Sequence, residues 1–452
     1  MMNSSRKLDP LHGSLAKNIL LFALPVSFGA ILQQLFNAVD TAVVGRFASP
    51  QALAAVGSNG PVINLFINLF VGISIGAGVI IARYIGEGNK ARISKAVHTA
   101  MLTALITGCI LLVMIQFFAR PILNLIETPD DVIELTVLYL RIYGLGFPFI
   151  MLYNFGAAIL RSAGDSRRPL NALTLAGVIN VFLNLFFVIV CHMSVAGVAL
   201  ATVISNTISS GLVIYYLMTE EEPLRLSIRK LAISRQELLS SLKIGMPAGL
   251  QSMVFSISNT CILSSINSFG SSAVAGSAVA VNCEYWAYSL ITGFVQATIT
   301  FTSQNYGARQ MDRCSKVWRW ATLECIIACM ILNSLFLVFR YPLIGLFTTD
   351  PKVIPFALLR MTSVLGLQWL VAIYEVGSGS MRGFGQSLIP MLLILFGSCL
   401  LRLVWIFAYI PTHHEWTTLM SIYPITWIVT VILVSTARYL VARAVYRKAA
   451  AA

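Results

Sequence analysis

Long apolar stretches dominate the sequence, and short segments that carry charges or Gly, Pro and Asn residues separate them. An α-helix needs about 20 residues to cross the hydrocarbon core of a bilayer, which is about 30 Å thick. Twelve stretches reach that length, and they lie near residues 17–44, 54–82, 96–119, 132–158, 170–191, 195–218, 240–266, 273–303, 317–339, 353–379, 386–410 and 418–440. The pattern predicts an all-α polytopic membrane protein with twelve transmembrane helices.

One long charged segment interrupts this pattern near the middle of the chain. It predicts a cytoplasmic linker at residues 219–239. The linker would separate an amino-terminal six-helix bundle, residues 1–218, from a carboxy-terminal six-helix bundle, residues 240–452.

The two halves of the sequence match each other at one constant offset, which shortens by a single position after one deletion. The matching pairs include Pro25 and Pro247, Asn37 and Asn259, Gly86 and Gly307, Arg161 and Arg382, and Gly164 and Gly385. Each half holds six predicted spans, an even number, so the repeats should enter the membrane in the same direction and form two pseudo-symmetric bundles. Two matched bundles with a cleft between them suit alternating access, which indicates a transporter.

Composition agrees with a membrane protein, because 57% of the residues are hydrophobic and only 11% are charged. A typical soluble domain has about 25% charged residues. The net charge of +13 would suggest a nucleic-acid partner in a soluble protein, but here the bases flank apolar runs that are too long for a globular core. We therefore expect the lipid bilayer, and no nucleic acid, as the partner of these bases.

The positions of the bases predict the orientation of the chain. All but seven of the 31 Lys and Arg residues fall on one side of the predicted spans, which places both termini in the cytoplasm and the chain in the inner or plasma membrane. The seven are Arg46, Arg120, Arg141, Arg340, Lys352, Arg360 and Arg402; the first six lie near outer ends and the last lies inside a span. Met1 to Pro10 is polar, so we expect no removable signal peptide.

Cofactor chemistry and catalysis have no clear signature. The eight cysteines form no CxxC pair and do not cluster with the five histidines, so we expect neither a metal site nor disulfides. No Walker motif follows a strand, so we expect no cofactor beyond a coupling ion. An isoprenoid-lipid enzyme would need paired acid motifs, and Asp130 with Asp131 is the only adjacent aspartate pair. We therefore expect no enzyme.

Four ionisable residues lie deep inside predicted spans, and such residues are costly in a membrane and often functional. They are Asp40, Glu284, Glu375 and Arg402. Helical spacing gathers Gln33, Gln34, Asn37, Asp40 and Thr41 on one face of the first span. This face is either an interhelical hydrogen-bond seam or a cation or proton site.

Other polar residues of the first half lie at suitable positions to complete a site around Asp40. Asn180 and Asn184 share a helix face at i and i+4, and Thr202 lies at a similar depth, although amides in spans also serve as packing contacts. Pro25 and Pro247 lie within matching spans and predict kinks or hinges.

The second half offers a different polar set. Gln368 and Glu375 share a face, Glu375 and Arg402 are candidates for a buried pair of structural or functional importance, and Glu284 shares a face with Tyr288. We expect the substrate cleft to be lined by Gln34, Tyr153, Asn154, Gln251, Asn259, Asn282, Glu284, Gln368, Glu375 and Arg402.

Four short motifs are weak singly and specific together. The first is Leu24-Pro25 with the run from Asn37 to Thr41 and Gly45; the others run from Gly86 to Asn89, from Ala157 to Ser166 and from Ser380 to Gly385. Through them the chain resembles the multidrug and toxic compound extrusion (MATE) family over essentially all twelve spans. The resemblance implies a V-shaped cleft between two six-helix bundles, export of cationic or amphipathic compounds, and coupling to inward flow of protons or sodium.

The first bundle resembles the DinF-like branch of that family more than the NorM-like branch. The resemblance implies that Asp40 is the residue that becomes protonated, with Asn180 and Thr202 as its partners. Asn184 stands where archaeal and related members carry a second aspartate, which leaves one titratable group in the cluster. Phe255 and Val371 stand at about the places of the NorM-like sodium-site acids.

Together these features predict a monomeric secondary antiporter for small, drug-like molecules. Asp40 would couple ion and substrate flow with Asn37, Asn180, Asn184 and Thr202. The alternative is a flippase-like exporter of a lipid-linked or amphipathic metabolite.

Overall fold

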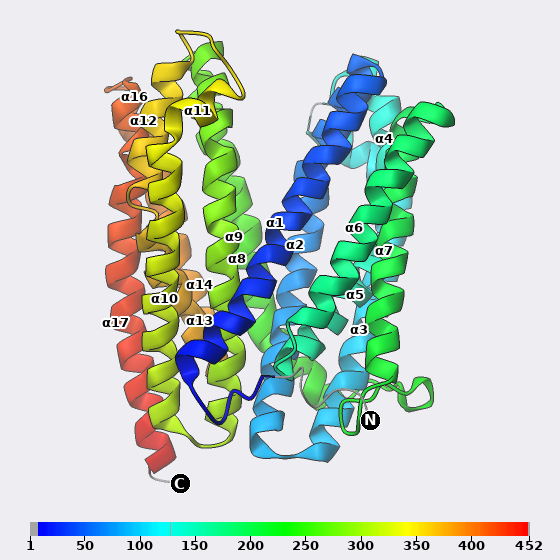
Figure 1. The fold of residues 1–452 in the computed structure, drawn as a ribbon, viewed down its shortest axis with the longest axis vertical. Coiled ribbons are helices and arrows are strands. Elements are labelled where there is room, and N and C mark those ends of the chain that lie inside the picture. Colours follow the sequence, from blue (N-terminus) through cyan, green and yellow to red (C-terminus); the bar gives the residue numbers. More distant parts are fainter. Residues whose placement is uncertain (1–7, 127, 451–452) are drawn as a thin grey trace. The chain divides into compact units, whose positions relative to one another are not determined.

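A computed structural model describes residues 8–126 and 128–450, and they fold into helices joined by short turns (Figure 1). The first half contains α1 (Leu15–Phe47), α2 (Pro50–Glu87), α3 (Lys90–Leu125), α4 (Asp130–Gly144), α5 (Phe147–Ser162), α6 (Arg167–Leu185), the π-helix η1 (Phe186–Val190), α7 (Ser194–Met218) and the 3₁₀-helix η2 (Ile228–Lys230). The second half contains α8 (Arg235–Asn267), α9 (Ser271–Gly307), α10 (Met311–Val338), α11 (Arg340–Gly345), α12 (Ile354–Leu365), α13 (Trp369–Gly383), α14 (Leu388–Ile394), the π-helix η3 (Leu395–Leu400), α15 (Leu401–Val404), the π-helix η4 (Trp405–Tyr409), α16 (Trp416–Met420) and α17 (Ile422–Ala450).

Helices suit this sequence because an apolar chain in lipid must satisfy its backbone polar groups internally. Within the described residues, eight helical segments are long and apolar enough to cross a membrane, and two bent helix pairs raise that number to ten. The pairs are α4 with α5 and α12 with α13. The helices α8 and α9 coincide with two more predicted spans and are long but less apolar, so the count of twelve spans remains a prediction.

The structure divides into two compact units whose limits differ from the predicted bundles 1–218 and 240–452. Unit 1 contains Met1–Leu8 and Phe28–Gly249, and unit 2 contains Asp9–Ser27 and Leu250–Ala452. The first half of α1 thus belongs to unit 2, and the first half of α8 belongs to unit 1. The physical reason is local packing, because each half-helix lies against a helix encoded in the other half of the sequence.

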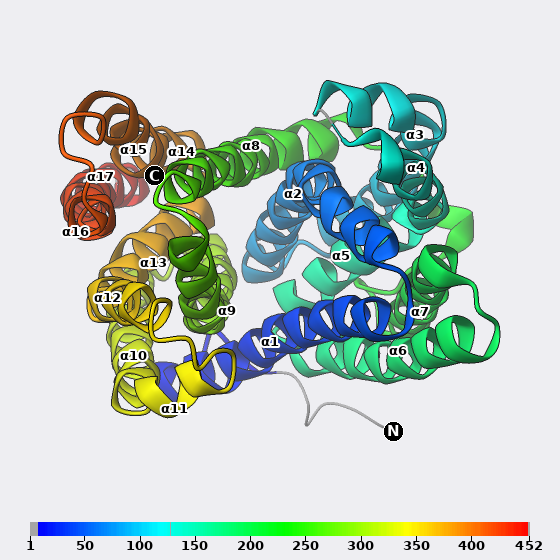
Figure 2. The same cartoon turned by 90° about the horizontal axis from the view of Figure 1, so that it is seen from above.

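Each unit has its own packed interior. In unit 1, α5 packs on α2, α3 and α7, and α6 lies beside α7. In unit 2, α9 packs on α10, α12 and α13, and α13 also packs on α17 (Figure 2).

The internal repeat is visible in the backbone. The bend of 47° between α4 and α5 has a counterpart of 44° between α12 and α13. Gly164 and Gly385, which match in the sequence repeat, both have φ of +84°, a left-handed conformation that favours glycine. The repeat is therefore one of structure as well as of sequence.

The half-helices that belong to the other unit are held by very close backbone approach. In unit 1, a Cβ built on Gly72 of α2 would lie 2.2 Å from the backbone nitrogen of Gly249 and 2.8 Å from the carbonyl oxygen of Gly245 on α8. In unit 2, a Cβ on Gly293 of α9 would lie 2.5 Å from the carbonyl oxygen of Ala23 on α1. Small residues allow such contact between membrane helices.

The predicted linker 219–239 belongs to unit 1, where its backbone is bonded to α3. The amide of Ser227 donates to Nε2 of His98 at 3.1 Å, and the amide of Ser234 donates to Oγ1 of Thr99 at 3.0 Å. Hydrogen bonds at two points therefore hold this segment against the first third of α3.

We predict that Gly72→Leu strongly destabilises the protein, because the new side chain would collide with the backbone of α8, which cannot rotate away. Overpacking costs about 1 to 3 kcal/mol or more, so the midpoint of thermal unfolding in detergent should fall by several degrees. The matched control is Gly211→Leu in α7, where a Cβ meets nothing within 4 Å. That control should be neutral or slightly stabilising, since leucine favours helix more than glycine does. Equal unfolding midpoints for the two variants would contradict the packing described here.

Candidate functional site

The clearest polar cluster of unit 1 joins α1 to α6 around Asp40. The side-chain Nδ2 of Asn184 donates both to Oδ1 of Asp40 and, at 3.1 Å, to Oδ1 of Asn180. Both asparagines are buried and Asp40 is half-buried. The predicted i, i+4 pair on α6 therefore does lie against the acid of α1, with Asn184 as the direct contact.

A glycine on α6 allows α1 and α6 to pack closely beside this cluster. Gly177 lies on α6 at the level of Phe36 on α1, and a Cβ at this position would be 1.7 Å from the phenyl ring. Gly177, Asn180 and Asn184 are spaced to share one helix face. The π-helix η1 begins two residues after Asn184, and π segments often occur at functional sites.

The amide of Asn184 is oriented for an ionised Asp40, because its nitrogen faces the carboxylate. Its Oδ1 atom is buried and has no hydrogen-bond partner among the described residues. A protonated Asp40 no longer needs the amide donor and instead has a hydroxyl to donate. The cluster can thus take two hydrogen-bonded arrangements that differ by one proton.

Two other predicted partners of Asp40 do not contact its carboxylate. Thr202 donates to the carbonyl of Val198 on its own helix at 3.0 Å. Asn37 has an exposed side chain, and its carbonyl accepts from Thr41 at 3.0 Å. Threonine hydroxyls in helices commonly donate to a carbonyl of the preceding turn. The depth of Thr202 in its span therefore did not determine the partner of its hydroxyl.

An open cavity of about 810 Å³ begins one residue beyond Asp40. It is lined by residues of α1 and α2, namely Thr41, Ala42, Gly45, Arg46, Phe47 and Leu53. The carboxylate is therefore close to a region that a small molecule or water can occupy.

In unit 2, Glu284 of α9 forms a two-pronged ion pair with Arg360 of α12. The two nitrogen to oxygen distances are 2.7 Å and 2.9 Å. Arg360 also donates to Ser277 at 2.6 Å, and Gln368 donates to the carbonyl of Glu284 at 3.0 Å. A paired carboxylate of this kind is more strongly fixed than the carboxylate of Asp40.

Arg402 and Glu375 do not form the suggested pair. Arg402 is 1% exposed. Its guanidinium lies over the rings of Phe255 and Tyr423 and donates to Thr426 at 3.4 Å. The ring of Tyr423 also faces the guanidinium of Arg360, with 5.3 Å from that group to the ring centroid. Aromatic faces stabilise cations, so Arg402 is accommodated by rings in place of a carboxylate.

Glu375 instead belongs to a set on the inner part of α13. It is buried, and Arg382 lies seven residues further along the same face of α13. Arg382 donates to Oε1 of Gln251 on α8 at 2.8 Å. Of the predicted cleft residues, Gln251 therefore bonds Arg382, which shares a face of α13 with Glu375.

The remaining predicted cleft residues have local hydrogen bonds or exposed side chains. Tyr153 donates to the carbonyl of Pro169 at 3.2 Å, Asn154 to that of Ile150 at 2.8 Å, and Asn282 to that of Ala278 at 2.9 Å. The side chains of Gln34 and Asn259 are exposed. Each of these residues is available to a ligand only through its exposed portion.

Sequence reasoning missed two ionisable residues inside helices. Arg360 was assigned to an outer end, and no pattern in the sequence pairs it with Glu284. Glu324 of α10 has a buried Oε2 atom with no hydrogen-bond partner among the described residues. This acid lies within the predicted span 317–339, so its position alone was a sufficient signal.

Comparison with known proteins assigns the chain to a family. The MatE family model matches residues 25–186 and again residues 247–410, so its two matches begin at Pro25 and at the repeat partner Pro247. The chain is 27% identical over 435 residues to the probable multidrug resistance protein YoeA of Bacillus subtilis, with 93% of each protein covered. It is 25% identical over 348 residues to a FAD transporter of Shewanella oneidensis, with 76% of this chain and 77% of that protein covered.

A solved structure has the same fold. It is an outward-facing multidrug resistance MATE family transporter of the MOP superfamily, with a TM-score of 0.91, 23% identity, and coverage of 99% of this chain and 100% of that chain. The similarity to this structure supports the fold. The two matches of the family model together cover most of the sequence. The chain belongs to the MatE family of multidrug and toxic compound extrusion transporters, and it is a multi-pass membrane protein and not an enzyme.

Proposed function

We propose that the protein is a secondary active multidrug efflux antiporter, which exports cationic or amphipathic compounds in exchange for protons. The observation that carries this proposal is the carboxylate of Asp40, which accepts a hydrogen bond from the neutral amide of Asn184 inside a membrane-spanning helix. One acid held by amides suits a single proton, whereas a sodium ion prefers several oxygen ligands. This supports coupling to protons over coupling to sodium, and the DinF-like branch over the NorM-like branch.

The coupling step follows from the two arrangements of the cluster. Ionised Asp40 holds α1 to α6 through Asn184, and protonation removes the charge that strengthens this bond. A hydrogen bond to a charged group contributes about 1.5 to 3 kcal/mol, and a neutral one contributes less. Protonation therefore frees this part of α1 to move, and the ion gradient acts on the conformational equilibrium through that difference.

We further propose the architecture expected for alternating access. The chain would form twelve spans in two six-helix bundles around a V-shaped cleft, as a monomer in the inner membrane with both termini in the cytoplasm. Pro25 and Pro247 would act as hinges, which is supported by their positions two residues before the points where α1 and α8 pass from one compact unit to the other.

A second candidate function is export of an amphipathic metabolite. It is favoured by the network in unit 2, where Arg360 and Arg402 both face the ring of Tyr423 and Glu284 is paired with Arg360. Buried guanidinium groups beside aromatic rings suit an anionic aromatic compound. The FAD transporter among the relatives supports the same direction.

We predict that Asp40→Asn slows gradient-driven export at least about tenfold while leaving substrate binding intact. Protein in proteoliposomes would be given an inward proton gradient or an inward sodium gradient, with ethidium as the exported cation and flavin dinucleotide as the alternative. The wild type should export ethidium with the proton gradient, and Asp40→Asn should lose at least about tenfold in rate, since one missing interaction of about 1.4 kcal/mol has that effect. The exposed Asp312 of α10 offers the control Asp312→Asn. Full export by Asp40→Asn with full dependence on the gradient would refute the assignment.

We predict different effects for two polar residues that the sequence placed beside Asp40. Asn184→Ala removes the donor to the carboxylate, and export should slow by about tenfold because a hydrogen bond to a charge is lost. Thr202→Val removes only a bond within α7 and should transport at close to the normal rate. Initial rates of ethidium export at matched protein density would test this, and equal loss in both variants would show that Asn184 has no special role.

A further inference from the structure

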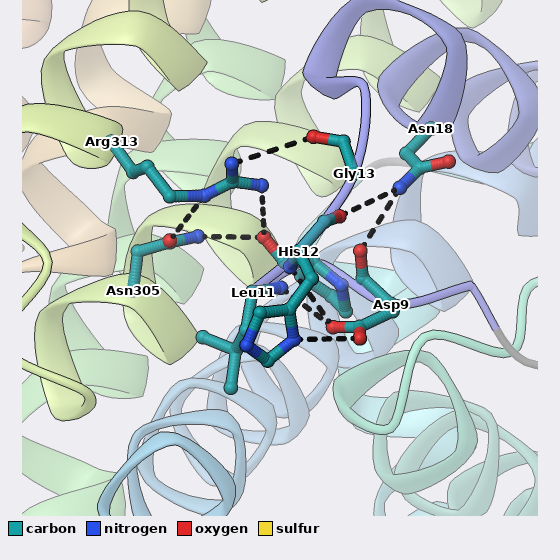
Figure 3. Close-up of polar contacts among 8 residues, drawn as sticks. Asp9, Leu11, His12, Gly13, Asn18, Asn305 and Arg313 are labelled. Atoms are coloured by element: carbon teal, nitrogen blue, oxygen red, sulfur yellow. Dashed lines mark hydrogen bonds and ion pairs between the residues drawn. The ribbon is translucent and has the colours of Figure 1, made fainter.

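The residues before α1 form a folded turn. Oδ1 of Asp9 accepts from the amides of Leu11 and His12 at 2.9 Å and 3.2 Å, and Oδ2 faces Nδ1 of His12 at 2.8 Å (Figure 3). Asn18 in the first turn of α1 donates to the carbonyl of Asp9 at 2.9 Å. Burial raises the pKa of the Asp9 carboxyl, but the hydrogen bonds from His12 and Leu11 outweigh it, so the net pKa lies below its usual value. The turn therefore keeps its ionised acceptor at neutral pH.

Two side chains of unit 2 hold this turn, as Figure 3 shows. Asn305 at the end of α9 is fully buried and donates to the carbonyl of Pro10 at 3.1 Å. Arg313 in α10 uses three different nitrogens, which donate to Oδ1 of Asn305 at 3.1 Å, to the carbonyl of Pro10 at 3.2 Å and to the carbonyl of Gly13 at 3.4 Å. We call Asn305 and Arg313 the α1 clamp.

Unit 1 holds the start of α8 in a corresponding way. The hydroxyl of Tyr84 at the end of α2 donates to Oε2 of Glu237 at 2.6 Å. Nε of Arg92 in α3 lies 3.5 Å from Oε1 of Glu237, and its guanidinium stacks over the ring of Tyr84. Glu237 is 2% exposed in the first turn of α8. We call Tyr84 and Arg92 the α8 clamp.

The two clamps occupy equivalent positions of the internal repeat. Tyr84 matches Asn305 and Arg92 matches Arg313, at the same offset that pairs Gly86 with Gly307. The turns between the clamp residues also agree, because Gly88 and Arg309 match at this offset and both have positive φ, of 68° and 60°. An arginine in a left-handed conformation is uncommon, which indicates that this turn geometry is specified.

Each clamp is one of several attachments along a half-helix. On either side of Pro25, α1 contacts α9. The ring of Phe22 meets that of Phe301 edge to face at 5.6 Å, and Ser27 donates to the carbonyl of Leu290 at 2.9 Å, so α1 is held to α9 as far as the unit boundary. The same half of α8 crosses α2 at Gly245 and Gly249. The α1 clamp holds the amino-terminal end of the first half of α1, and the α8 clamp holds the amino-terminal end of the first half of α8.

We propose that the α1 and α8 clamps are positioning elements of the transport cycle, which hold the first halves of α1 and α8 fixed so that movement is confined to the segments beyond Pro25 and Pro247. This inference rests on the proposed transport function. Asp40 lies beyond Pro25, so its protonation can move the second half of α1 productively only if the first half does not follow. Loss of a clamp therefore weakens the coupling of protonation to export without removing the binding site.

The chemistry of the two clamps differs, and this difference supplies the test. Arg313 needs its planar fork, because it reaches three acceptors on separate nitrogens, and lysine has one nitrogen. Arg92 makes an ion pair with a carboxylate, a role that an ammonium group can also fill. Arg92→Lys should therefore rescue the α8 clamp, whereas Arg313→Lys should behave like Arg313→Ala.

We would measure amide hydrogen exchange in purified full-length protein, over peptides covering residues 9–18 and 235–241. Arg313→Ala should speed exchange in the first region, and Arg92→Ala in the second, by about tenfold, since each loses hydrogen bonds to charge. Asp9→Ala should loosen residues 9–18 from the other side of the contact. Arg319→Ala, which removes an exposed arginine of the same helix α10, is the matched control and should leave both regions unchanged.

The same variants would be assayed for ethidium binding and proton-driven ethidium export. We expect ethidium affinity within about twofold of wild type and export slowed by about fivefold or more in Arg313→Ala, Arg313→Lys and Arg92→Ala, with Arg92→Lys close to wild type. Unchanged exchange in both alanine variants, or faster exchange with full export, would overturn the clamps. If the wild type itself showed no gradient-driven export, the proposed function would fail instead, while the exchange data would still report on the contacts.

Discussion

The close crossing of backbones at small residues is the interaction on which this structure depends. Gly72 meets Gly245 and Gly249, and Gly293 meets Ala23 and Ser27, at distances that leave no room for a Cβ on either central glycine. These crossings bind the first half of α8 within unit 1 and the first half of α1 within unit 2. Both long helices consequently belong to one unit at one end and to the other unit at the other end. The chain therefore passes between the two units within α1 and within α8.

A glycine also allows close packing beside the Asp40 cluster on the other half of α1, where it meets a side chain in place of a backbone. Gly177 accepts the ring of Phe36, and this approach brings Asp40 within reach of Asn184. The helix is thus fastened by packing in its first half and by a hydrogen bond that depends on charge in its second half. In the proposed mechanism, the attachment that responds to the coupling proton is the hydrogen bond between Asn184 and Asp40. This division gives a physical reason for a hinge near Pro25, where one kind of attachment gives way to the other.

Helical periodicity was sufficient to predict the parts of the site that lie on one helix face. Asn180 and Asn184 at i and i+4, and Asp40 on the polar face of the first span, were recognised in this way and do lie together. Contacts that depend on rotamers or on distant helices were not predictable: Thr202 bonds its own turn, Glu284 pairs with Arg360, and Arg402 faces rings where an acid was expected. The limits of the compact units differ from the predicted bundle limits for a related reason. Linker composition marks where the sequence changes, whereas packing decides where a compact unit ends.

The exchange of half-helices has a consequence for what counts as the folding unit. A single repeat of this sequence would expose the glycine groove of its second helix, and its own first half-helix would have no surface on which to pack. In this structure each groove is filled by the first half-helix of the other repeat. The relation between the two halves is therefore that of a domain-swapped dimer joined into one chain. The sequence repeat and the compact unit are therefore different stretches of polypeptide, and they are offset by about half a helix.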